Sequence, residues 1–142
     1  MIEMTAPASD AAARIRILVV DDEVQNLTTF QRVWRKHYEI ETATSGAAGL
    51  ALLADREFDV VLTDYCMPLM DGETFTRKAR TTQDVAIVMI TGYLDTPGVR
   101  ALVDAGELFS VLGKPWHRDA VLDVVARASE RTQAIRAGTA AR

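Results

Sequence analysis

The sequence contains few of the features that mark specialised classes of protein. Its 142 residues include one cysteine, so no internal disulfide can form, which fits a reducing cytoplasm. The longest unbroken apolar run, residues 85–90, is far shorter than the roughly 20 residues that a membrane span needs. Residues 1–14 lack the basic start and apolar middle of a signal peptide. We therefore expect a cytoplasmic protein with no membrane span.

Basic residues are also in the minority, and no block of lysine and arginine occurs. Sixteen basic residues against twenty acidic ones give a formal net charge of -4, which argues against direct binding of nucleic acid. The hydrophobic fraction of 49% is typical of a globular protein with a buried core. Because domains cluster at about 100 to 150 residues, we expect one folded domain over 15–130. A flexible N-terminal tail over 1–14 precedes it, and a helix end with a tail follows over 131–142.

Short apolar runs alternate five times with longer segments of helical pattern. The predicted strands are residues 15–20, 38–44, 58–63, 85–90 and 108–112. The predicted helices are residues 24–36, 46–55, the segment from the Asp71-Gly72 turn to about residue 80, 96–105 and 116–137. The first, third and fourth strands are apolar at nearly every position, as in strands covered by helices on both faces. The pattern predicts a doubly wound α/β fold with a five-stranded parallel sheet in the order 2-1-3-4-5.

Polar side chains follow the predicted strands, at the edge where open α/β sheets bind ligands. Asp21 and Asp22 follow the first strand, and Asp64 follows the third. These two strands are neighbours in the predicted order, so we expect the three carboxylates to converge. Thr91 and Lys114, which follow the fourth and fifth strands, should close the other side.

Three carboxylates at one edge repel one another and require a positive partner. With one cysteine and two histidines in the chain, a zinc site has no ligand set. Mg²⁺ or Mn²⁺ suits carboxylate, carbonyl and water ligands. A carboxylate beside such a metal can attack a phosphoryl group. The metal, Lys114 and the Thr91 hydroxyl would then hold the three phosphoryl oxygens.

Four motifs at these strand ends resemble those of the receiver domains of two-component response regulators. They are Leu18-Val19-Val20-Asp21-Asp22-Glu23, Asp64-Tyr65-Cys66-Met67-Pro68-Leu69-Met70-Asp71-Gly72, Ile90-Thr91-Gly92 and Lys114-Pro115-Trp116. The motifs agree with the family in order, spacing and strand-end position. The resemblance covers about residues 15–130 and implies a flavodoxin-like receiver fold.

The resemblance implies that Asp64 accepts a phosphoryl group from a histidine kinase or a phosphotransfer protein. It further implies that Asp22, Asp64 and the backbone carbonyl of Cys66 ligate Mg²⁺ directly, while Asp21 does so through water. Phosphorylation would then switch a partner-binding face. An output domain, a downstream protein and a second copy of the chain all remain open as partners.

The same resemblance implies that Thr91 and Lys114 bind the phosphoryl oxygens and that the Lys114-Pro115 bond is cis. One position departs from the family pattern, because receivers usually carry an aromatic residue three positions before the lysine. That position is Val111, and we expect Phe109 to lie on the same strand face, about 7 Å away. We therefore expect a smaller conformational change through Thr91.

Several neighbours of the motifs have simpler interpretations. We expect Asp71 and Gly72 to form a helix cap and a turn, and Trp34 and Trp116 to be packing residues. The resemblance also implies that Cys66 and Tyr93 occupy the two variable positions whose side chains overhang the phosphoryl site. Bulk there should obstruct an attacking water, which predicts a long-lived aspartyl-phosphate.

Two other functional classes remain open. A receiver could serve as a docking or dimerisation module without phosphorylation, as Val111 suggests. An aspartyl-nucleophile phosphatase or phosphotransferase also uses Asp, Lys, Thr and Mg²⁺, but such enzymes generally need a second acid two residues after the nucleophile. Here that residue is Cys66.

Overall fold

A single parallel sheet organises the chain in the computed structural model, which describes residues 14–92 and 96–138. The strands are β1 (Arg16–Val20), β2 (Glu39–Ala43), β3 (Val60–Asp64), β4 (Ala86–Thr91) and β5 (Ser110–Gly113). Their order is β2-β1-β3-β4-β5, and every neighbouring pair is parallel. The predicted strand order is confirmed.

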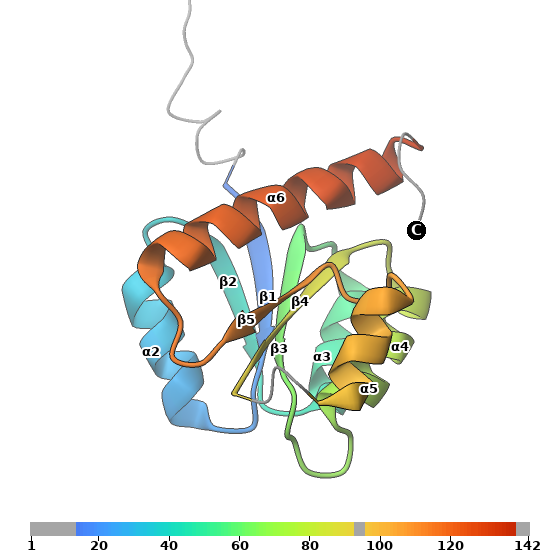
Figure 1. Cartoon of the computed structure of the whole chain (residues 1–142). Helices are drawn as coiled ribbons and strands as arrows, with labels where there is room; N and C mark the ends of the chain where they lie inside the picture. The colour runs from blue at the N-terminus through green and yellow to red at the C-terminus, as the bar shows by residue number, and fades with distance from the viewer. Residues whose placement is uncertain (1–13, 93–95, 139–142) are drawn as a thin grey trace, which may run out of the picture.

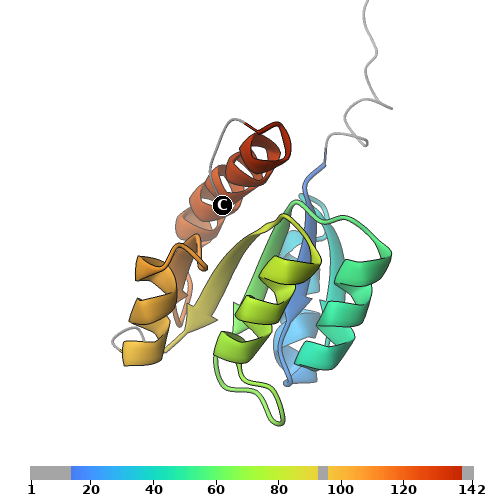
Figure 2. The ribbon, with the colours of Figure 1, turned by 90° about the vertical axis from the view of Figure 1, so that its right-hand side faces the viewer.

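Helices cover both faces of this sheet. They are α2 (Val24–Trp34), α3 (Gly46–Asp55), α4 (Gly72–Thr82), α5 (Pro97–Asp104) and α6 (Arg118–Arg136). Figure 1 shows α2 on one side of the strands and α3, α4 and α5 on the other, and the turned view in Figure 2 shows these three helices in front of the sheet. No described helix is both long enough and apolar enough to cross a membrane.

The hydrophobic core is divided into two clusters by the sheet. In β1, Ile17 and Val19 belong to the cluster beneath α2 and α6, whereas Leu18 and Val20 belong to the cluster beneath the other three helices. This division follows from the strand geometry, because successive side chains point to opposite faces. Strands buried on both faces explain the nearly continuous apolar runs in the sequence.

Side-chain caps begin two of the helices, and the predicted cap at Asp71 is one of them. The Ser45 hydroxyl accepts a hydrogen bond from the Ala48 amide at 3.1 Å, and α3 begins after it. The Asp71 carboxylate accepts one from the Thr74 amide at 2.8 Å, and α4 begins at Gly72. Both caps satisfy amides that have no partner within their own helix.

The last two elements begin later than the sequence pattern predicts. Strand β5 starts at Ser110 instead of residue 108, and α6 starts at Arg118 instead of residue 116. The predicted helix start at Trp116 is wrong. Its ring instead packs against Phe30 and Trp34 of α2, with centroid distances of 6.2 Å and 5.9 Å.

The C-terminal turns of α6 are tied to the sheet by polar contacts. The buried Thr132 hydroxyl donates to the Asp59 carbonyl at 2.7 Å and accepts from the Ala86 amide at 2.9 Å. The Arg136 guanidinium donates to the Phe58 carbonyl at 2.7 Å. The last turns of α6, beyond residue 130, therefore pack on the domain.

Candidate functional site

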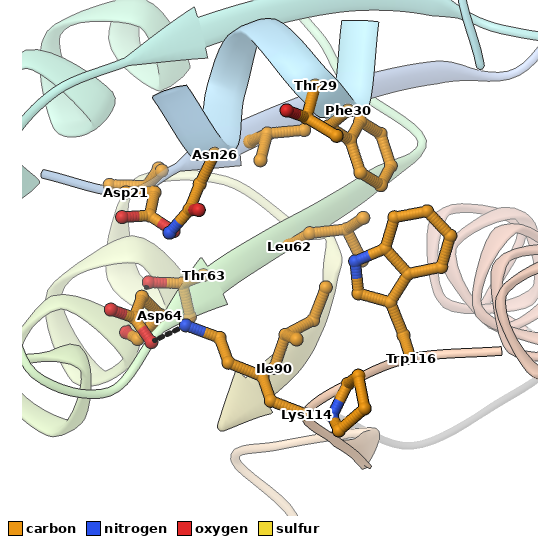
Figure 3. Close-up of a pocket in the computed structure, with 13 residues that line it drawn as sticks. Asp21, Asn26, Thr29, Phe30, Leu62, Thr63, Asp64, Ile90, Lys114 and Trp116 are labelled. Carbon is orange, nitrogen blue, oxygen red and sulfur yellow. Dashed lines mark hydrogen bonds and ion pairs between the residues drawn. The ribbon is translucent and has the colours of Figure 1, made fainter. Parts of the chain in front are cut away.

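The register of β1 and β3 brings the predicted acidic residues together. Val20 lies opposite Thr63, so Asp21 and Asp64, the next residue in each segment, emerge at the same level. Asp21, Asp22 and Asp64 each offer a carboxylate oxygen, and these atoms all lie within 4.8 Å of one another. Figure 3 shows the Asp21 and Asp64 side chains at the same end of the cavity. The predicted convergence of the three carboxylates is confirmed.

Asp21 is the most buried member of this group, with 7% of its surface exposed. Its carboxylate accepts hydrogen bonds from the Glu23 amide at 2.9 Å and from the Asn26 side-chain amide at 3.1 Å. Burial raises the pKa of Asp21 above its ordinary value, and the negative charge of Asp64 raises it further, although the two hydrogen bonds act in the opposite direction. A nearby cation would relieve this unfavourable charge.

Lys114 reaches the cluster from the far side. Its ammonium nitrogen lies 3.0 Å from Oδ1 of Asp64 (Figure 3), and its backbone amide donates to the Thr91 carbonyl at 3.0 Å. Burial lowers the pKa of Lys114, but the hydrogen bond and charge of Asp64 outweigh this effect and leave the pKa raised. Lys114 therefore stays protonated at neutral pH. Thr91 is almost completely buried at the end of β4, and the predicted cis bond between Lys114 and Pro115 is present.

The turn between β3 and α4 leaves no room for a side chain at Gly72. Its amide donates to the Tyr65 carbonyl at 2.7 Å. A Cβ atom added to Gly72 would lie 2.3 Å from the backbone oxygen of Asp64, well inside van der Waals contact. The Asp71-Gly72 pair is therefore structural, as predicted, and it holds the backbone that carries Asp64. Cys66 is exposed in the same turn.

The donor set of the cluster fits a hard divalent cation. Within the described residues it is the one group of three or more potential metal-ligating side chains, and all three are carboxylates. Carboxylate oxygens suit Mg²⁺ and Mn²⁺, whereas zinc sites use cysteine and histidine. Three carboxylates face the single ammonium of Lys114, so the formal charges of this cluster do not balance.

A cavity of about 600 Å³ extends from this cluster toward α2 and the loop between β5 and α6. Asp21, Asp64 and Lys114 line its polar end, and Phe30 and Trp116 line its apolar end (Figure 3). Sequence reasoning did not anticipate the apolar end. It also did not anticipate Asn26, although its position in the first turn of α2 would have placed it near Asp21.

The expectation that Phe109 and Val111 share a strand face is wrong. Val111 packs against the cluster beneath α3, α4 and α5, whereas Phe109 packs against the cluster on the opposite face. The guanidinium groups of Arg127 and Arg131 lie 5.6 Å and 5.8 Å from the Phe109 ring centroid. Because β5 begins only at Ser110, strand alternation does not extend back to Phe109. The expectation for Tyr93 lies outside the described residues.

A five-stranded doubly wound sheet, with three acidic side chains and a lysine at its C-terminal edge, defines a signalling domain of the receiver type. The sequence matches the response regulator receiver domain over residues 17–126. The chain belongs to this family.

Relatives that contain similar sequences are longer than this chain. It is 30% identical over 115 residues to the hydrogenase transcriptional regulatory protein HoxA of Cupriavidus necator, covering 80% of this chain and 24% of that protein. It is 40% identical over 89 residues to the response regulator PleD of Caulobacter vibrioides, covering 60% of this chain and 19% of that protein. The chain thus spans about a quarter or less of these relatives.

Solved structures share the same architecture. A structure of adenylate cyclase from Rhodopirellula baltica has a TM-score of 0.83 at 28% identity, covering 88% of this chain and 94% of that one. The signal receiver domain of an HD domain-containing protein from Pseudomonas fluorescens Pf-5 has a TM-score of 0.77 at 28% identity. That match covers 85% of this chain and 98% of the other.

Proposed function

We propose that this receiver domain is a phosphoacceptor in a two-component phosphorelay. Asp64 takes the phosphoryl group from a histidine kinase or a phosphotransfer protein. The observation that carries this proposal is the group of three carboxylates within 4.8 Å, one of which, Asp64, is bound by the Lys114 ammonium. This arrangement combines a nucleophile, a cation site and a fixed positive charge.

The carboxylates of Asp21, Asp22 and Asp64 and the backbone carbonyl of Cys66 would hold Mg²⁺ or Mn²⁺. When bound, the ion neutralises negative charge on the carboxylates and on the incoming phosphoryl group. The hydrogen bonds from the Glu23 and Asn26 amides keep the Asp21 carboxylate oriented toward the cluster.

Phosphoryl transfer needs only one nucleophilic step. An Asp64 carboxylate oxygen forms a bond to phosphorus while the phosphorus–nitrogen bond of the donor phosphohistidine breaks. The imidazole nitrogen leaves with the bonding electrons and takes a proton from solvent. The Lys114 ammonium and the Thr91 hydroxyl each donate a hydrogen bond to a phosphoryl oxygen, so they stabilise the charge on the transferred group.

Phosphorylation then shifts the population of conformations and alters a face that a partner recognises. We expect this shift to be small near Thr91, because Val111 takes the place of the usual aromatic residue. The domain would act in the cytoplasm through an output domain, a downstream protein or a homodimer, and its acidic charge disfavours direct contact with nucleic acid.

The position of Val111 also favours an alternative, in which the domain docks or dimerises without phosphorylation. An enzyme of the aspartyl-nucleophile class is disfavoured, because Cys66 stands where such enzymes carry their second acid. Repeated turnover of a generic phosphate ester would support that class.

The decisive experiment is incubation of the chain with Mg²⁺ and excess acetyl phosphate, followed by intact-protein mass spectrometry. We expect the mass to rise by one phosphoryl group and the gain to disappear when Mg²⁺ is chelated. Asp64→Asn should abolish the gain. Asp71→Asn is the matched control, because asparagine also caps helices and the variant should still be phosphorylated. No gain in the native chain would favour the docking module, and a gain retained in Asp64→Asn would refute Asp64 as the acceptor.

A further inference from the structure

Lys114 lies on the loop between β5 and α6, directly after the last residue of the strand. The residue follows the end of an edge strand, and 37% of its side chain is exposed. Its backbone amide is held by the Thr91 carbonyl of β4 at 3.0 Å. One backbone hydrogen bond does not by itself determine where a long, flexible lysine side chain lies. The segment that follows Lys114 is the next place where the loop can be attached to the domain.

Trp116, two residues further on, provides a second attachment. Its ring meets the Phe30 ring edge to face, with the centroids 6.2 Å apart, and lies 5.9 Å from the Trp34 ring. Both partners belong to α2, and both are almost completely buried in the core. A large aromatic ring packed on a buried surface has few alternative positions. Trp116 therefore fastens the loop to α2.

Helix α2 also supports the acidic side of the site. It begins at Val24, directly after the acidic motif, and Asn26 in its first turn donates to the Asp21 carboxylate at 3.1 Å. Figure 3 shows the Phe30 and Trp116 rings at one end of the cavity and Asp21 and Lys114 toward the other. The same helix thus contacts both sides of the site, through Asn26 at its start and through Phe30 and Trp34 further along.

We propose that Trp116 is a positioning residue for Lys114. Its contact with α2 fixes the loop so that the ammonium stays where the phosphoryl group on Asp64 would lie. This inference rests on the proposed function. Loss of the ring should slow phosphoryl transfer without changing Mg²⁺ affinity, because β1 and β3 hold the carboxylates independently of Trp116.

The test compares phosphorylation rates with acetyl phosphate and Mg²⁺ in a double-mutant cycle. We expect Trp116→Ala to slow the reaction about tenfold, since small misplacements of a reacting group cost large factors in rate. Trp116→Phe should restore most of the rate because it retains a ring. In a Lys114→Ala background, Trp116→Ala should have no further effect, since the residue acts through Lys114.

Phe109→Ala is the matched control. Phe109 is another half-buried aromatic residue that packs against the same hydrophobic cluster, but it lies at the opposite end of β5 from Lys114. This variant should keep the native rate. Equal slowing by Trp116→Ala in the native and Lys114→Ala backgrounds would overturn the proposal, as would a native rate in Trp116→Ala.

A second measurement does not depend on phosphorylation. Amide hydrogen exchange at Lys114 reports whether its bond to the Thr91 carbonyl stays closed. We expect Trp116→Ala to reduce protection of this amide about tenfold and Phe109→Ala to leave it unchanged. Unchanged protection in Trp116→Ala would refute the role of the ring in holding the loop. If the native chain accepts no phosphoryl group, the proposed function fails, while exchange still decides whether Trp116 holds the loop.

Discussion

Each end of the sheet has a buried aspartate with 7% of its surface exposed, but the two differ in the charges of the groups that surround them. Asp59, at the N-terminal end, accepts hydrogen bonds from the Arg16 amide at 2.8 Å and from the Gln133 side chain at 3.0 Å. The guanidinium of Arg136 lies 3.9 Å from the same carboxylate. The chain therefore supplies Asp59 with both hydrogen bonds and positive charge.

Asp21, at the C-terminal end, receives two hydrogen bonds from neutral amides and has two further carboxylates beside it. Burial and the charge of Asp64 raise its pKa. The single ammonium nearby, that of Lys114, is hydrogen-bonded to Asp64. Burial of a carboxylate is common to both ends, so burial alone does not indicate function. The excess of negative charge is what distinguishes the C-terminal end, and it supports the proposed cation site.

The largest effect on stability should come from Asp59→Ala. Removing this carboxylate takes away the acceptor of the Arg16 amide and of the Gln133 side-chain amide, and it removes the negative charge that faces Arg136. We therefore expect a loss of about 3 kcal/mol in the free energy of unfolding. Urea denaturation measures this loss. Asp55→Ala is the control, because the Asp55 side chain is 70% exposed, and it should change stability by less than about 0.5 kcal/mol. A loss below about 1 kcal/mol in Asp59→Ala would show that the hydrogen bonds around Asp59 contribute little to stability.

An intermediate effect should follow from Mg²⁺ binding. At ten times its dissociation constant, an ion that binds only the folded chain adds about 1.4 kcal/mol to the free energy of unfolding. Thermal or urea unfolding with and without Mg²⁺ measures the gain. The gain should be lost in Asp22→Asn and retained in Asp59→Ala, because Asp59 lies at the other end of the sheet. Loss of the gain in both variants would contradict the separation of the two ends.

The smallest effect should be the pH dependence that Asp21 contributes in the absence of Mg²⁺. Because its folded-state pKa lies above the ordinary value of 3.8, the folded chain binds the proton more readily than the unfolded chain between these two values. The contribution to stability is therefore present at low pH and is lost as pH rises through the raised pKa. Unfolding curves across this range should show that loss in the native chain and not in Asp21→Asn. An identical pH dependence in both proteins would show that Asp21 does not contribute to the pH dependence of stability.

The site could be predicted from the sequence because of one general property of the fold. Because parallel strands end at the same edge of a sheet, residues that follow neighbouring strands meet there, whatever their separation along the chain. This property allowed Asp21, Asp22 and Asp64 to be placed together before the structure was known. Lys114 was placed near them by the same reasoning, and the structure confirms its contact with Asp64.

The same reasoning could not find residues whose positions depend on packing. Phe109 was assigned to the wrong face, because the alternation of β5 starts only at Ser110. Trp116 was assigned to the final helix, whereas the ring packs on α2. The contacts between Asp59 and the last turns of α6 join segments that no local pattern relates.

The sequence by itself determined the alternation of strands and helices, the order of the strands and the edge at which the acidic residues gather. These features follow from hydrophobic periodicity and from the geometry of parallel sheets, both of which are local or general. Only the tertiary structure decided which aromatic rings pack against Trp116 and which buried aspartate has a positively charged group beside it. Those outcomes depend on contacts between side chains far apart in the chain, and such contacts are settled only when the elements pack together.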